Sequence, residues 1–198
     1  MLAVALTGGI GAGKSTALEA FAALGAATLS CDDVVHELLR YDEEVRDTLR
    51  DRFGDEILDA HGQIDRAALG QRVFNRTEDL EFLESVLHPR VIRQQRRFRE
   101  QLAASSDPTQ ICVIEVPLLY EVSAEGRFDK VVVITAPAKL RWERAGDRID
   151  EREERLLSEA EKVRRGDYVY SNDGTLAELE AFVADVTARL RAELEAEE

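Results

Sequence analysis

Residues 8–15 read GGIGAGKS and fit the pattern G-x-x-x-x-G-K-[ST] at every fixed position. An apolar run, Leu2–Leu6, precedes the segment, and a helix-forming run follows it. Glycines leave backbone N–H groups open to phosphate oxygens, and the start of a helix adds the positive end of its dipole. Lys14 supplies a positive charge for the β- and γ-phosphates, and Ser15 supplies a hydroxyl for Mg²⁺. The segment predicts a nucleoside-triphosphate site, a P-loop.

The rest of the chain narrows the class of P-loop protein. No guanine-reading NKxD is present, and neither of the two D-x-x-G strings, at 51–54 and 59–62, follows a strand. Glu115 ends an apolar run in the manner of a Walker B acid, but the chain is short and has a large helical segment. This layout suits a small-molecule kinase, which needs a second pocket for its acceptor and a lid that keeps water from the activated phosphate.

Composition sets further limits. The chain has 198 residues and a net charge of −14, which argues against general nucleic-acid binding. No apolar run has the length of a membrane span, and the opening MLAVAL is too short for a signal peptide, so we expect a cytoplasmic protein without membrane contact. Cys31 and Cys112 form no CxxC pair, so we expect two buried thiols and no zinc site.

Apolar patterning predicts an α/β fold with a five-stranded parallel sheet flanked by helices. The expected strands are at 2–6, 27–31, 111–116, 130–135 and 167–170. Helices are expected from Lys14 to about Leu24 and from about Leu176 onward, and Pro89 is expected to start a new helix. The nucleotide-binding core would be formed by residues 1–32, 110–136 and 166–198. Residues 33–109 would form a helical acceptor domain, and residues 137–165 would form a lid.

Several further segments, in order along the chain, resemble dephospho-CoA kinase. They are ALTGGIGAGKST at the start, IDRAALGQRVF at 64–74, LHP at 87–89, VPLLYE at 116–121 and DYVYSNDGT at 167–175. The resemblance implies the P-loop kinase fold, with ATP and Mg²⁺, and transfer of a phosphoryl group to the ribose 3′-hydroxyl of dephospho-CoA. This is the last step of CoA biosynthesis.

The chain departs from the family pattern at three places. Ser30 stands where the family has the first Asp of an Asp-x-Asp motif. The segment after Arg148 is shorter than in the family, and the usual Arg-x-x-Gln is not evident. These departures leave open which arginine of the lid reaches the phosphates.

The resemblance implies nucleotide contacts in three regions. In the P-loop they come from Gly8, Gly9, Ile10, Gly11, Ala12, Gly13, Lys14, Ser15 and Thr16. Asn172 and Gly174, after the last strand, fall where such kinases place the adenine pocket, although turn chemistry alone also explains them. Arg144 and Arg148 would clamp the transferring phosphoryl group, and the alternative is an exposed helix with paired charges.

The remaining roles concern the acceptor. Asp32 would accept the proton of the ribose hydroxyl or orient Mg²⁺ indirectly, and its alternative role is to cap the following helix. Contacts with dephospho-CoA are expected from Asp32, His36, Arg66, His88 and Glu121, and packing roles are the alternative for both histidines. We expect a monomer or a weak homo-oligomer.

Two rival functions remain at this point. One is another P-loop nucleotide or small-metabolite kinase, and the other is a non-catalytic nucleotide-binding regulatory module.

Overall fold

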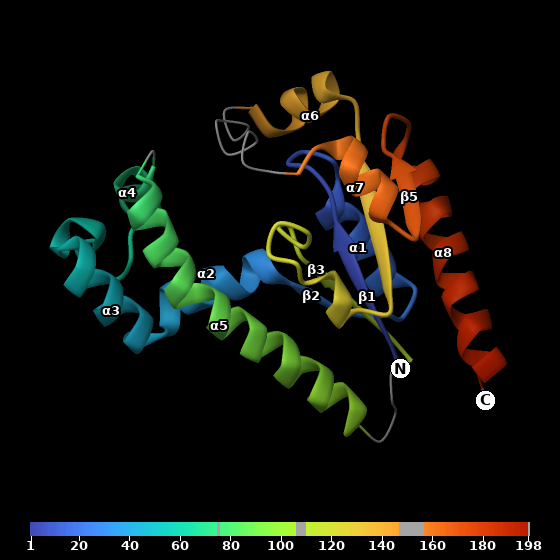
Figure 1. Cartoon of the computed structure of the whole chain (residues 1–198), viewed down its shortest axis with the longest axis horizontal. Coiled ribbons are helices and arrows are strands. Elements are labelled where there is room, and N and C mark those ends of the chain that lie inside the picture. Colours follow the sequence, from blue (N-terminus) through green and yellow to red (C-terminus); the bar gives the residue numbers. More distant parts are fainter. Residues whose placement is uncertain (75, 106–109, 147–156, 198) are drawn as a thin grey trace. The chain divides into compact units, whose positions relative to one another are not determined.

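A single parallel sheet organises most of the chain (Figure 1). The computed structural model describes residues 1–74, 76–105, 110–146 and 157–197. The strand order is β2-β3-β1-β4-β5, which confirms the expected five-stranded α/β fold. The strands are β1 Leu2–Thr7, β2 Ala27–Ser30, β3 Ile111–Glu115, β4 Lys130–Thr135 and β5 Tyr168–Ser171.

Helices connect the strands and make up the long segment between β2 and β3. They are α1 Lys14–Ala23, α2 Cys31–Tyr41, α3 Glu43–Phe53, α4 Arg66–Val73, α5 Thr77–Ala103, α6 Ala138–Ala145, α7 Glu159–Arg165 and α8 Leu176–Glu197, with short 3₁₀ turns at Asp55–Ile57 and Glu125–Arg127. The chain forms two compact units, one of Met1–Cys31 with Arg99–Glu198 and the other of Asp32–Phe98.

The centre of the first unit is β1, which is buried along its whole length. Its even-numbered residues face a core shared with α1 and α8. That core is apolar because α8 presents one buried stripe, Leu179, Val183, Val186 and Leu190. Burial of each such side chain contributes about 1.5–3 kcal/mol. Helix α8 contacts both α1 and β5, so it covers this side of the sheet (Figure 1). Both cysteines are buried thiols, as expected.

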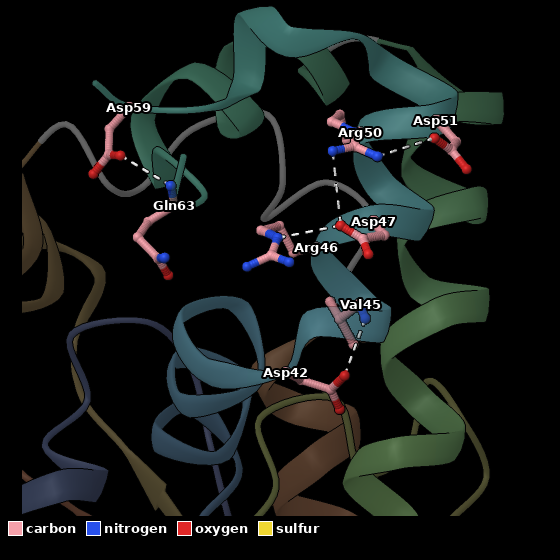
Figure 2. A network of polar contacts seen from close by, with 8 residues as sticks. All are labelled: Asp42, Val45, Arg46, Asp47, Arg50, Asp51, Asp59 and Gln63. Atoms are coloured by element: carbon pink, nitrogen blue, oxygen red, sulfur yellow. Dashed lines mark hydrogen bonds and ion pairs between the residues drawn. The ribbon is translucent and has the colours of Figure 1, made fainter. Parts of the chain in front are cut away.

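In the second unit, residues 32–74 and 76–98 as described form helices and one isolated bridge but no strand. Helix α3 buries Val45, Leu49 and Phe53, and the Phe53 ring meets Phe82 of α5 edge to face. Its outer surface carries paired charges, and Asp42 caps its first turn by accepting from Val45 N over 3.0 Å (Figure 2). In the same unit, the carboxylate of Asp79 in α5 accepts from the guanidinium groups of Arg52 and Arg72. The unit therefore has its own apolar core and its own buried carboxylate.

The structure differs from the expectation at Pro89, which lies inside one continuous helix, α5. A proline removes one N–H from the helix ladder. The carbonyl that loses this bond is Ser85 O, and side chains donate to two other carbonyl groups nearby: Arg90 Nη1 to Val86 O over 2.9 Å, and Ser85 Oγ to Phe82 O over 2.7 Å. Burial of Val86, Leu87 and Val91 on both sides of the proline adds to the continuity of the helix.

Candidate active site

The P-loop connects β1 to α1 at the carboxyl end of the central strand. Gly8 lies so close to the backbone of β4 that a Cβ atom there would overlap Ile134 O. Gly13 has φ 102°, a left-handed conformation that glycine adopts without strain, and α1 begins at the next residue. The loop therefore places several backbone N–H groups and a helix start at one point, as anion binding requires.

Lys14 lies at this point with its side chain largely buried. Its Nζ donates to Gly9 O over 3.1 Å and lies 4.0 Å from Glu115 Oε1. Glu115 ends β3, is 3% exposed, and is in register with both Leu6 and Ser30. A buried carboxylate thus faces the P-loop lysine across the edge of the sheet. Ser15, the next residue, is exposed.

Asn172 contacts the P-loop from the loop that follows β5. Its Nδ2 donates to Ala12 O over 2.8 Å, and its backbone N donates to Thr135 O over 2.7 Å. A Cβ atom on Gly13 would overlap the same side-chain amide. Asn172 is 7% exposed, so this amide supports the phosphate loop from behind. Gly174 lies nearby in the sequence and is exposed.

Arg141 of α6 is the arginine that meets the P-loop in the described part of the chain. It is 6% exposed, and its backbone carbonyl lies 2.6 Å from the position of a Cβ atom on Gly11. Sequence reasoning did not select Arg141. Its spacing in the sequence did not distinguish it from Arg144, which lies three residues later in the same helix. Arg144 is exposed on the same helix, and Arg148 lies outside the described residues.

Glu121 follows β3 and pairs with a lysine rather than standing alone. Its Oε1 lies 3.0 Å from Lys162 Nζ and accepts from Leu157 N over 2.9 Å. Lys162 is 1% exposed. The pair ties α7 to the loop after β3, within the first unit. No sequence pattern signalled Lys162, because its partner is far away along the chain.

The expected acceptor residues of the second unit include one direct contact. His36 Nδ1 lies 2.6 Å from Arg66 Nη1, and both side chains are exposed. Because arginine is always a donor, His36 Nδ1 accepts and the ring N–H is on Nε2. Asp32 is exposed in the first turn of α2, and His88 is half-buried within α5.

Two negative findings apply to the described residues. Within them, no three His, Cys, Asp or Glu side chains gather closely enough to form a metal site of their own. Across the same residues, no helix combines the length and apolar character that crossing a membrane requires.

Known structures resemble this chain over nearly its whole length. A crystal structure of a Thermus thermophilus protein matches with a TM-score of 0.77 at 31% identity. The match covers 96% of this chain and 97% of that protein. Dephospho-CoA kinase from Campylobacter jejuni has a TM-score of 0.64 at 26% identity, with coverage of 95% and 96%.

A buried parallel sheet, a P-loop after its central strand and a buried acid on the neighbouring strand define a P-loop kinase. The family model for dephospho-CoA kinase matches residues 2–178. Dephospho-CoA kinase of Methylococcus capsulatus is 37% identical over 190 residues, which are 92% of this chain and 93% of the relative. The chain belongs to the dephospho-CoA kinase family.

Proposed function

We propose that this protein transfers the terminal phosphoryl group of ATP to the ribose 3′-hydroxyl of dephospho-CoA and releases CoA and ADP. The observation that carries the proposal is the Lys14 ammonium, held at Gly9 O and Glu115, in a chain that matches the family over 2–178. The new bond joins the ribose oxygen to the γ-phosphorus, and the bond to the oxygen bridging the β- and γ-phosphates breaks.

ATP would bind at the P-loop, residues 8–16. Its phosphates would accept from the loop N–H groups and take the place of Gly9 O as a partner for Lys14. A divalent cation fits this site, because Mg²⁺ binds through few protein ligands together with substrate phosphates, and the Ser15 hydroxyl is exposed at the start of α1. When bound, Mg²⁺ neutralises charge on the β- and γ-oxygens.

Asp32 is our proposed general base. It follows the end of β2 by two residues and is exposed, so its carboxylate is free to accept the proton of the ribose hydroxyl. Phosphoryl transfer depends mostly on positioning, so a base contributes roughly 10²–10⁴ in rate. A helix-capping role for Asp32 is the alternative.

The acceptor would bind to the Asp32–Phe98 unit. The contact between His36 and Arg66 supports this, because the remaining guanidinium donors of Arg66 and the Nε2–H of His36 are together suited to phosphate oxygens. His88 and Glu121 are further proposed contacts. For Glu121 the bond from Leu157 N and the pair with Lys162 already occupy Oε1.

Residues 137–165 are our proposed lid. Arg144 and Arg148 are the predicted phosphate contacts within it, and the position of Arg141 beside the P-loop makes it a third candidate. Asn172 and Gly174 would border the adenine. We further propose a cytoplasmic protein that acts as a monomer or a weak homo-oligomer.

The test is ADP release from ATP with dephospho-CoA beside a panel of other alcohols and nucleotides. We expect turnover with dephospho-CoA that requires Mg²⁺, and loss of turnover in Lys14→Ala. Turnover only with another acceptor would show a different small-molecule kinase. In Asp32→Asn, intact ATP binding with lost turnover supports the base. No turnover with any acceptor by the parent protein would favour a regulatory module.

A further inference from the structure

Two charged side chains, Arg141 of α6 and Glu159 of α7, converge on one point of the P-loop. A Cβ atom built on Gly9 would lie 2.9 Å from Arg141 Nη1 and 2.6 Å from Glu159 Oε1. Both distances are too short for a carbon contact, so a side chain here would displace both groups. The P-loop pattern itself accepts any residue at this position. The absence of a side chain at Gly9 therefore leaves room for both charged groups.

Arg141 is a buried cation whose orientation is partly set by the backbone. Its Nε donates to Ala136 O over 3.2 Å, and the residue is 6% exposed. A buried guanidinium is stabilised by the opposite charges that lie near it. Glu159 brings a carboxylate to the position that Arg141 Nη1 also approaches.

The carboxylate of Glu159 is held in turn from the other side. Thr135 Oγ1, at the end of β4, donates to Glu159 Oε2, which leaves Oε1 directed toward Gly9. Glu159 is the first residue of α7, and the buried Lys162 of that helix lies 3.0 Å from Glu121 Oε1. The strand end and the buried ion pair therefore both restrain the part of α7 that carries Glu159.

We propose that Glu159 is a positioning residue for the ATP site. Its carboxylate, oriented by Thr135, sets the Arg141 guanidinium against the Gly9 side of the P-loop, where that guanidinium meets the phosphates of ATP. An arginine that is already oriented loses less side-chain freedom when the nucleotide binds. The inference rests on the proposed function in one respect, namely that the P-loop binds ATP.

The first test is Glu159→Gln, which keeps the shape and an acceptor for Thr135 but removes the charge beside Arg141. We expect the KM for ATP to rise about five- to tenfold while kcat changes less than about twofold. The KM for dephospho-CoA should stay constant. Thr135→Val should shift the KM for ATP in the same direction by a smaller factor. Glu161→Gln is the matched control on the same helix, where Glu161 pairs with Arg164, and it should change neither parameter.

The second test asks whether Glu159 acts through Arg141. In an Arg141→Gln protein the further change Glu159→Gln should have almost no effect on ATP affinity, because the group to be oriented is gone. An equal loss in both backgrounds, or tighter ATP binding by Glu159→Gln, would overturn the proposal. Arg141→Lys replaces Arg141→Gln in the cycle if thermal melting shows that the latter does not fold.

The same double-mutant cycle of Glu159 and Arg141 can be measured by calorimetric titration with ATP alone, in the absence of an acceptor. The inference is therefore tested even if dephospho-CoA proves not to be the substrate. Coupling in ATP binding without turnover of dephospho-CoA would support Glu159 and reject the proposed acceptor. Turnover of dephospho-CoA without coupling in ATP binding would support the proposed acceptor and reject the role of Glu159.

Discussion

The side-chain amide of Asn172 donates a hydrogen bond to the main-chain carbonyl of Ala12 over 2.8 Å. The backbone N of Asn172 is held by Thr135 O at the end of β4. The loop after β5 therefore supports the P-loop through a side chain whose own position is fixed by the sheet. The bond satisfies the Ala12 carbonyl and restrains the P-loop.

Asn172→Asp tests this support. The change replaces the donor with a carboxylate oxygen that repels Ala12 O, so we expect ATP to bind about tenfold more weakly. Titration calorimetry measures the effect. Asp173→Asn, at the exposed neighbouring position, is the control and should bind ATP normally. Unchanged affinity in Asn172→Asp would show that the P-loop does not depend on this bond.

Two glycine substitutions should have opposite effects on stability. Gly8→Ala places a methyl group onto Ile134 O, and we expect it to lower the free energy of unfolding by at least about 3 kcal/mol or to prevent folding. Gly70→Ala, inside α4 with open space around it, should raise the free energy of unfolding by about 0.5–1 kcal/mol. Urea denaturation measures both. A neutral Gly8→Ala would mean that β1 and β4 can separate at this point.

Removal of the buried lysine should destabilise the sheet unit. Lys162→Met leaves the Glu121 carboxylate without its counter-charge, and the expected loss is about 3 kcal/mol in the free energy of unfolding. Adding Glu121→Gln should recover part of the loss, because glutamine still accepts from Leu157 N. Lys139→Met is the control: its lysine is 86% exposed, and the expected change is below about 0.5 kcal/mol. Equal losses in the two lysine variants would contradict the assignment.

Alkaline pH should weaken the fold through Cys112. Burial raises the pKa of its thiol from 9.0 to about 11, and nearby Arg99 opposes the shift with a smaller effect. Between these values the unfolded chain releases the proton and the folded chain keeps it. The contribution of the Cys112 thiol to the free energy of unfolding is therefore complete below pH 9 and is lost as pH rises to about 11. Burial also raises the pKa of Tyr120 from 10.0 to about 12, which adds a loss of the same sign at higher pH.

Urea denaturation at several pH values measures this loss. Between pH 9 and 10 the slope of stability against pH should be flatter in Cys112→Ala than in the parent protein, because the variant lacks the thiol while Tyr120 contributes equally in both. Equal slopes would show that the Cys112 thiol does not determine the pH dependence.

Local pattern was enough to predict the sheet and the phosphate loop. The three central strands, β1, β3 and β4, are mostly apolar runs, and GGIGAGKS carries its turns and its charge within eight residues. Both depend on neighbours in the sequence, so they can be inferred without knowledge of the packing. The course of α5 depended on more than local pattern, because at Pro89 burial of Val86 and Val91 outweighed the local signal for a helix start.

The arginine at the phosphate loop could not be chosen from the sequence. Arg141 and Arg144 lie three residues apart on the same short helix, so their spacing in the sequence does not distinguish them. Only the docking of α6 on Gly11 buries one and exposes the other. The same holds for Lys162 and Glu159, whose partners Glu121 and Thr135 come from other elements.

The amino-acid sequence by itself determined the fold class, the family and the place of the phosphate site. Tertiary structure decided which charged side chains surround that site, because a charge is stabilised by whatever packs against it and not by its neighbours along the chain.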